Sequence, residues 1–428
     1  MTGVGTRIAV VFVVGLGAVG PGSVRAVRAA AFGGYGLVDH FLFPDGSGPF
    51  DVLADGRLIT LAGADVYVES APRSRSFTLL GALPDADIAS FGAAFVRVSP
   101  DGTRFAVGNN GGTAMSVAVD QALEQAARGG RRDAVRVGSS TMDRAQRARR
   151  LLASRAAELA GTGTFEVGVF ALSGLSGEWF AAGHFDAEWI DDRHLAIAGG
   201  DFGSPAVVTA LDTESVDPAD PVNPIIIDNI GGASGGVAFD EAGNLFTGNG
   251  FSTIGPSGTG VVKAFAESDW MAAMSGGTPP DFENDGTVIV DVLSASPLDF
   301  DGEGNLLIGG GDFFGSGEGD FAAIVRSAVV SAALSGSGPA DVNDPTNVRR
   351  LDPDLSSEFN FYSVRYNEVT GEMYVRDGRV FAYQDVMGVP AASSWGLTVM
   401  ALAMLAAGTL AVRRTHHFPA RAAEAVRS

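Results

Sequence analysis

Six copies of one short pattern recur along the chain: two strand-like apolar runs joined by a tight turn rich in Asp, Asn and Gly. An Asp-Gly or Gly-Asn turn between two alternating runs predicts a β-hairpin. Six hairpins in one chain predict a repeat architecture, which limits the possible folds more than any other feature. The copies span residues 50–59, 95–107, 187–197, 236–246, 297–307 and 363–374.

In the second half of the chain, each hairpin is followed by two further strand-like runs. The third runs are 206–211, 261–265 and 322–326, and the fourth are 225–228, 288–291 and 348–351. Loops around Pro218-Ala219-Asp220, Pro279-Pro280-Asp281 and Pro339-Ala340-Asp341 are expected between them. A repeated four-stranded antiparallel unit predicts an all-β fold, a β-propeller of six blades, or seven if the first hundred residues contain another. The apolar stretch 35–43 can complete the last blade and close the ring.

These repeats resemble those of bacterial exported propellers of the NHL and Tyr-Val-Thr-Asn (YVTN) type. They lack the Trp-Asp and Gly-His signatures of WD40 blades. The resemblance implies a propeller body, which we place at residues 31–388.

Residues 1–30 have the organisation of a secretory signal peptide. Arg7 precedes an apolar run that starts at Ile8, and small residues follow, with Val24-Arg25-Ala26 and Val27-Arg28-Ala29 as cleavage sites. The string Gly15-x-Gly17-x-x-Gly20 matches a dinucleotide fingerprint, but no βαβ unit surrounds it. Export is therefore the prediction for this segment.

Residues 389–414 predict a membrane segment. The apolar stretch 397–412 forms a helix of barely sufficient length to span a bilayer, and residues 415–428 form a short basic cytoplasmic tail. A short motif, an apolar helix and an arginine pair resemble sorting signals of the PEP-CTERM type, particularly the Ile-Pro-Thr-Leu (IPTL) variety; a plain tail anchor is the alternative. The residues concerned are Val389, Pro390, Trp395, Gly396, Arg413 and Arg414. Ala391 and Ala392 replace the Thr-Leu of that motif. The resemblance implies membrane attachment and a sorting or processing protease as a partner.

Residues 120–161 interrupt the β-pattern with helix signals. Nine arginines and two aspartates between Arg128 and Arg155 give this insertion a charge of +7. It is either a basic arm for acidic partners or a solvated insertion in one blade. Aromatic residues that could stack on bases are missing from it.

The propeller body is strongly acidic. The whole chain carries −21; removing +3 for the signal region, +3 after Val412 and +7 for the insertion leaves −34. This charge argues against nucleic acid as a partner of the body. The chain has no cysteine, which excludes disulfides and thiolate metal sites.

Catalytic motifs are weak. Gly232-x-Ser234-x-Gly236 matches a nucleophile elbow, but a strand follows it in place of a helix. Asp299-x-Asp301-Gly302-Glu303 is either part of a calcium loop or an ordinary Asp-Gly turn.

Four glycine-rich loops follow second strands and place polar residues at matching positions. In a propeller these loops share one face, so their side chains are expected to converge around the channel mouth. Such oxygens suit a cation, a sugar or a polar peptide; the alternative is that Asn and Asp merely tolerate left-handed turns. The predicted ligand-binding residues are Asn110, Asp201, Asn249 and Asp312.

Two functions remain open. The first is a non-enzymatic binding or structural propeller with an extracellular ligand, exported and held in the inner membrane or at the cell surface. The alternative is a metal-dependent propeller hydrolase or lactonase with Asp201, Asn249 and Asp312 around its metal. No cofactor is required by the sequence, and calcium is the ion that the polar loops suit.

Overall fold

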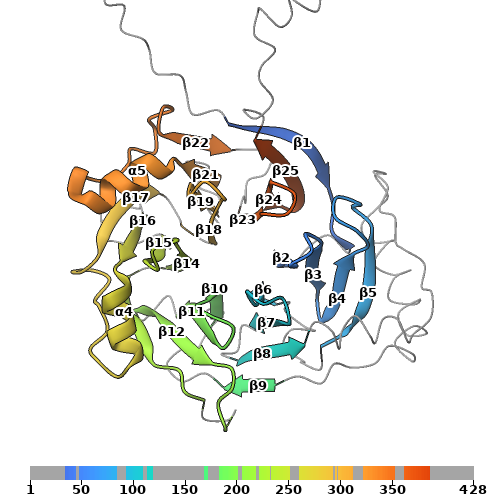
Figure 1. Cartoon of the computed structure of the whole chain (residues 1–428), viewed down its shortest axis with the longest axis horizontal. Helices are drawn as coiled ribbons and strands as arrows, with labels where there is room; N and C mark the ends of the chain where they lie inside the picture. Colours follow the sequence, from blue (N-terminus) through green and yellow to red (C-terminus); the bar gives the residue numbers. More distant parts are fainter. Residues whose placement is uncertain are drawn as a thin grey trace, which may run out of the picture. The chain divides into compact units, whose positions relative to one another are not determined.

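The computed structural model divides the chain into two units, Met1–Ala30 and Ala31–Ser428, and all described residues belong to the second unit. They are 34–44, 48–83, 93–108, 113–118, 168–171, 183–200, 205–217, 221–231, 233–250, 260–292, 295, 297–311, 322–351 and 361–385. Their strands form antiparallel sheets arranged around a central axis (Figure 1).

Five sheets have four strands each, in chain order from the axis outward. The first is β2 (Phe50–Val52), β3 (Leu58–Ala62), β4 (Asp65–Glu69) and β5 (Phe77–Ala82). The second is β6 (Phe95–Val98), β7 (Arg104–Gly108), β8 (Thr113–Ala118) and β9 (Gly168–Ala171). The third is β10 (Gly183–Trp189), β11 (His194–Gly200), β12 (Ala206–Asp212) and β13 (Ile225–Ile230). The fourth is β14 (Ala233–Phe239), β15 (Leu245–Gly250), β16 (Gly260–Phe265) and β17 (Thr287–Val292). The fifth is β18 (Leu298–Phe300), β19 (Leu306–Ile308), β21 (Ala322–Val325) and β22 (Val348–Leu351).

The remaining sheet has five strands and closes the ring. It consists of β1 (Tyr35–Phe41), β25 (Arg379–Asp385), β24 (Glu372–Asp377), β23 (Phe361–Asn367) and β20 (Gly310–Gly311). β1 pairs antiparallel with β25, which confirms the predicted closure by the N-terminal stretch. The structure thus shows five four-stranded blades and one five-stranded closing blade, which corrects the prediction of six or seven four-stranded blades. The difference arises because the closing sheet gains β20 at its inner edge.

Each hairpin forms because alternating apolar residues pack between neighbouring blades while an Asp-containing turn reverses the chain. In the turn of the fifth blade, Asp301 accepts backbone N–H bonds from Glu303 and Asn305, and Gly304 adopts a φ of 74°. Asp299 instead accepts the N–H of Tyr366 at 2.7 Å. These contacts support the turn interpretation of this segment over the calcium loop.

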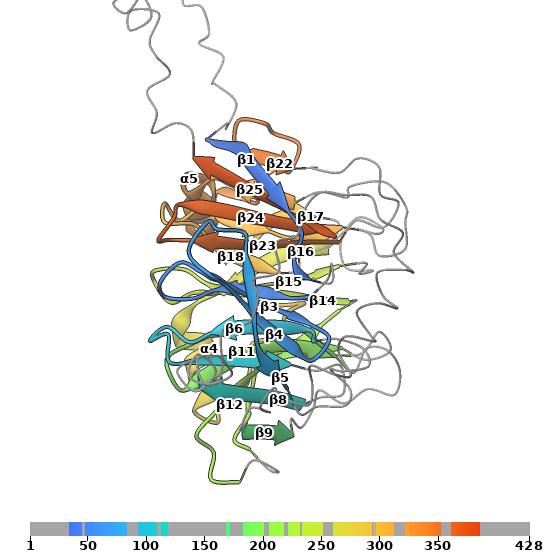
Figure 2. The same ribbon diagram turned by 90° about the vertical axis from the view of Figure 1, so that its right-hand side faces the viewer.

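Helices α4 (Glu267–Met274), α5 (Ser327–Ala332) and the π-helical turn η3 (Ala333–Ser337) lie where the sequence predicted only loops. Trp270 of α4 is buried, packs on Phe239 with ring centroids 5.4 Å apart, and donates to the Gly243 carbonyl at 3.0 Å. This burial stabilises a helix too short to persist alone. Figure 1 shows α4 and α5 at the outer margin of the ring, and Figure 2 shows the stacked sheets from the edge of the ring.

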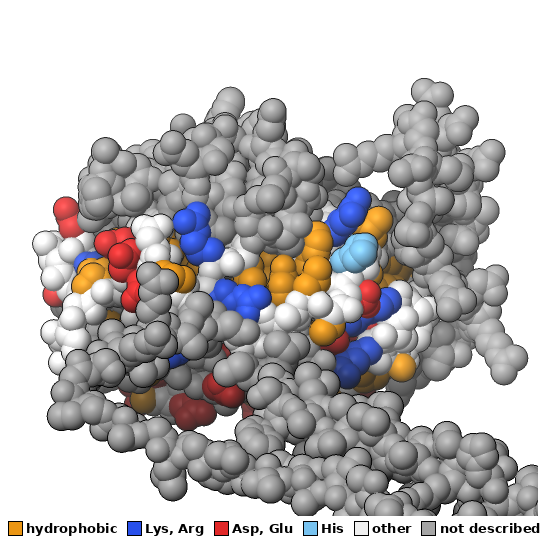
Figure 3. Space-filling view, turned by 90° about the horizontal axis from the view of Figure 1, so that it is seen from above, with side chains coloured by type: hydrophobic (Ala, Val, Ile, Leu, Met, Phe, Trp, Pro, Cys, Tyr) orange, Lys and Arg blue, Asp and Glu red, His pale blue; other side chains and the backbone are white. Residues whose placement is uncertain are grey.

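The outer surface beside β1 is mixed in character. Figure 3 shows apolar side chains there between basic and acidic ones. Leu37 and Val38 of β1 are about half exposed.

Several predicted segments fall outside the described residues. These are the signal peptide, the sorting segment with its transmembrane helix, and the insertion at 120–161, which belongs between β8 and β9 in the chain. Among the described helices, none is long and apolar enough to cross a bilayer.

Candidate functional site

The first strand of every blade borders the axis, and each contacts the first strand of the next blade around the complete ring. The pairing of each first strand with its second strand identifies one equivalent position on the six first strands. In every blade, the residue that follows this position pairs with a residue at the start of the second strand or next to it. We name these residues the axial ring: Asp51, Arg97, Glu188, Ala238, Asp299 and Arg365. Acidic and basic residues alternate around it, except that Ala238 stands where the third base would be.

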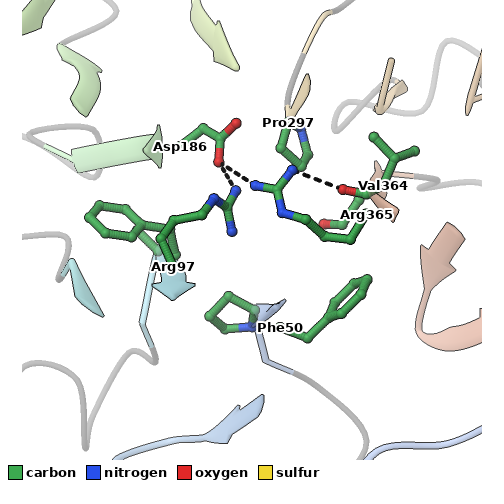
Figure 4. Close-up of a pocket in the computed structure, with 10 residues that line it drawn as sticks. Phe50, Arg97, Asp186, Pro297, Val364 and Arg365 are labelled. Carbon is green, nitrogen blue, oxygen red and sulfur yellow. Dashed lines mark hydrogen bonds and ion pairs between the residues drawn. The ribbon is translucent and has the colours of Figure 1, made fainter. Parts of the chain in front are cut away.

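Asp186 of β10 connects five of the six inner strands. Figure 4 shows its bonds to the two arginines. One carboxylate oxygen accepts from the Nη2 atoms of Arg97 and Arg365, the latter at 3.1 Å. The other accepts the backbone N–H groups of Val237 at 3.1 Å and Leu298 at 3.3 Å. The side chain is completely buried. Its charge is therefore compensated by two guanidinium groups and two amides.

Two axial-ring carboxyls connect neighbouring blades. Asp51 accepts the N–H of Val98 at 2.6 Å, and Asp299 accepts that of Tyr366 at 2.7 Å. In each case the carboxyl of one blade bonds to the first strand of the following blade. These bonds anchor the acidic members of the ring at the axis.

The axis carries more acid than base. With Asp186, four carboxyls face only two guanidinium groups, and an uncompensated buried charge is costly. Burial raises the pKa of Glu188 to about 8, against the opposing charge of Arg97. Burial likewise raises the pKa of Asp299 to about 7, and it raises the pKa of Asp51. Protonation of these carboxyls relieves the excess negative charge.

Glu188 remains accessible at the axis. Its side chain is 28% exposed, although protein surrounds it closely enough to shift its pKa strongly. Glu188 Oε2 lies 3.8 Å from Arg97 Nε, outside hydrogen-bond distance. A carboxyl that is neutral at pH 7 and reachable by solvent can donate a proton to a bound molecule.

The raised pKa values predict that the protein is less stable in mild alkali. A carboxyl whose pKa is raised on folding stabilises the fold fully below its unfolded pKa, and this contribution is lost as the pH rises through the folded pKa. The free energy of unfolding should therefore fall between pH 5 and 8.5, and Glu188→Gln should recover about 1–3 kcal/mol at pH 8.5. Urea unfolding at several pH values measures this. Equal pH dependence in both proteins would contradict the assignment.

A cavity of about 60 Å³ lies at the starting ends of the inner strands. Its charged lining residues are Arg97, Asp186 and Arg365 (Figure 4). Gly200, at the end of β11, pairs with Gly183 at the start of β10. The second strands therefore end on the same face of the ring as this cavity. The sequence predicts the four polar loops on that face.

Of the four predicted ligand-binding residues, only Asn249 is described. It is fully buried, donates to the Gly231 carbonyl at 3.0 Å and accepts from the Val261 N–H at 2.9 Å. Asn110, Asp201 and Asp312 lie outside the described residues, so the convergence of the four stays a prediction. Within the described parts of the chain, no three His, Asp or Glu side chains are grouped to hold a metal ion. Ser234 lies on strand β14, as its sequence context indicated.

Sequence reasoning missed the axial ring. A signal was available, because five of the six hairpin copies carry a charged residue at one aligned position within apolar strands: Asp51, Arg97, Glu188, Asp299 and Arg365. Asp186 could not be found by such an alignment, because the register of β10 against β11 shifts between His184 and Asp186.

Comparison with known proteins finds similarity in fold. No family model and no curated protein matches the chain. The PQQ-bound aldose sugar dehydrogenase of Streptomyces coelicolor is 12% identical, with 83% of this chain and 99% of that chain covered and a TM-score of 0.48. A gluconolactonase from Xanthomonas campestris is 13% identical, with 81% and 90% covered and a TM-score of 0.46. A putative gluconolactonase is 10% identical, with 80% and 90% covered and a TM-score of 0.44. By its strand order and the ring of contacts between its sheets, the chain is a β-propeller.

Proposed function

We propose that the protein is a propeller hydrolase whose reaction site is the axis, and that it opens a small polar ester or lactone. The observation that carries this proposal is Glu188, an accessible carboxyl with a pKa of about 8. At neutral pH such a group is mostly protonated and can serve as a general acid. A propeller hydrolase was the alternative function predicted from the sequence. The proposed reaction is now assigned to residues that the sequence did not single out.

The ring offers a complementary set of groups for hydrolysis. Water adds to the carbonyl carbon, Asp299 takes the proton of that water in its ionised form, and Glu188 protonates the departing alkoxide oxygen. Arg97 can stabilise the negative charge that develops on the carbonyl oxygen. Because the pKa of Asp299 is about 7 and that of Glu188 about 8, the required pair of one base and one acid is populated near neutral pH.

Hydrolysis of a sugar lactone by the purified full-length chain tests the proposal. Base uptake at constant pH should exceed the spontaneous rate, and Glu188→Gln should lower kcat about 100-fold because it removes the acidic proton. Glu214→Gln is the matched control, since that side chain is 56% exposed. If the lactone is hydrolysed only at its spontaneous rate in the presence of the protein, the proposal is wrong. The non-enzymatic binding module is then the better description. The names of the similar structures serve only to choose the first substrates.

The metal-dependent version of the proposal rests on Asp201 and Asp312. Metal analysis of the purified protein, with hydrolysis assayed before and after a chelator, separates it from the version that relies on Glu188. Loss of activity on chelation, together with normal activity of Glu188→Gln, would place the chemistry on the metal.

We retain export and membrane attachment within the proposal, supported by the residue patterns at 1–30 and 389–414. Fractionation of cells that express the full chain, beside a chain ending at residue 388, tests the anchor. Recovery of both chains in the same soluble fraction would contradict it.

A further inference from the structure

The cavity at the axis has an unusual wall. Arg97 and Arg365 border one part of it and both reach Asp186, as Figure 4 shows. Aromatic and proline side chains border another part: Pro49, Phe50, Phe95 and Pro297. The volume of about 60 Å³ has room for about two water molecules, close to the size of a carboxylate group.

Arg365 has two donors left over, its Nε–H and one N–H of Nη2. Its Nη1 donates to the carbonyls of Leu298 at 2.7 Å and Val364 at 3.0 Å, and its Nη2 donates to Asp186. The Nε atom is buried without a hydrogen-bond partner, and the side chain is only 3% exposed. Asp51 Oδ1 is 3.7 Å from it, too far for a hydrogen bond. A buried donor of this kind ordinarily has an acceptor, and leaving it unpaired is costly.

Arg97 also has donor capacity to spare. Its Nε donates to the Ala187 carbonyl at 2.5 Å, its Nη1 to the Val96 carbonyl at 2.6 Å, and its Nη2 to Asp186. Each Nη carries two hydrogens, so one N–H on each is not used by these bonds. The two guanidinium groups therefore have more donors than the described acceptors at the axis satisfy.

The charge of the wall selects the ligand. Two guanidinium groups and one carboxylate line the cavity, which leaves one positive charge when Asp186 is ionised and the three acidic members of the axial ring, which do not line the cavity, are protonated. Planar guanidinium groups are matched in geometry by carboxylates. A monocarboxylate supplies both the missing acceptor and the missing negative charge, and the aromatic wall suits its carbon atoms.

We propose that this cavity binds the carboxylate of a small organic acid, with Arg365 Nε and the spare N–H groups of Arg97 as its donors. The inference rests on the proposed function for its role, because opening a lactone or ester produces a carboxylate beside the axial ring. The site would then hold the acid product before release. Binding itself needs no turnover, so it can be measured independently.

Formate is the probe, because it is the smallest carboxylate. Titration of the full-length chain with sodium formate should raise the Tm in a saturable manner, since a ligand bound only by the folded state stabilises it. Sodium chloride at equal concentration controls for ionic strength. Arg365→Lys keeps the charge but removes the Nε donor, and it should weaken formate binding about tenfold or more. Arg193→Lys is the matched control, with its side chain 49% exposed.

Ser363→Val provides a second test that leaves both guanidinium groups intact. Ser363 lines the cavity from β23, and a branched side chain is well tolerated in a strand while filling part of the space. This variant should also lose the formate effect. An equal response to formate and chloride, or formate binding unchanged in both variants, would overturn the inference. Formate binding without lactone hydrolysis would support this site while refuting the proposed function.

Discussion

Replacement of Asp186 by asparagine should destabilise the protein more than any other single change at the axis. We expect the free energy of unfolding to fall by about 3–5 kcal/mol, the usual cost of removing one partner from a buried charged network. Asparagine has one carbonyl oxygen where Asp186 has two acceptors. Its NH2 group must therefore face either the guanidinium groups or the amides of Val237 and Leu298.

Urea unfolding of the full-length chain measures this loss. Asp55→Asn is the matched control, because the Asp55 side chain is 53% exposed and pairs with Arg57 at the surface. We expect a change within about 0.5 kcal/mol for the control. If both variants unfold at the same urea concentration, Asp186 is not the connection between blades that its hydrogen bonds indicate.

Loss of Arg75 should open the ring at its closure. The Arg75 side chain donates to Glu372 at 3.1 Å, to Asp39 of β1 at 3.1 Å and to the Tyr374 hydroxyl at 3.4 Å. Its guanidinium also lies 4.6 Å from the ring centre of Phe41. One side chain thus joins the N-terminal strand to the last blade.

Arg75→Met keeps much of the packing and removes the charge. Glu69 and Glu372 would then lose their shared cation in a buried site, and Glu372 would keep Arg73 at 3.3 Å, so we expect a loss of about 2–4 kcal/mol. Burial already raises the pKa of Glu69, with the nearby Glu372 adding to this effect. The double variant Arg75→Met/Glu372→Gln should regain part of the stability, because it removes one of the two carboxylates.

Hydrogen exchange locates the effect of Arg75→Met. Amides of β1 and β25 should exchange faster, while those of β15 and β16 on another blade should change little, since local opening is confined to the weakened unit. Uniformly faster exchange in every blade would show that Arg75 has no special part in closure.

The repeat and its closure could be predicted from sequence because each depends on local pattern. Alternating residues and Asp-Gly turns define the hairpins, and the apolar stretch 35–43, most of which is now seen as β1, was available as a partner for the last blade. The helices α4 and α5 were missed because their stability comes from tertiary burial, as for Trp270. Strand β20 was missed because two glycines carry no periodic pattern.

The candidate site was harder to predict because it arises from convergence. Arg97 and Arg365 are separated by most of the chain, and each appears in its own hairpin as a charged residue in an apolar strand. Only the ring geometry brings both to Asp186. The side-chain amide of Asn249, one of the predicted ligand-binding residues, bonds to backbone groups of its own blade and the preceding connection.

The proposed reaction requires Glu188 to be a neutral carboxyl at pH 7. Infrared difference titration of the full-length chain, compared with Glu188→Gln, measures this directly through the carbonyl band of a protonated carboxyl. We expect the wild-type protein to lose such a band as the pH rises through about 8, and the variant to lack this transition. If wild type and variant lose their carboxyl bands identically, with all acids ionised below pH 6, Glu188 is an ordinary carboxylate and the proposed reaction site is wrong.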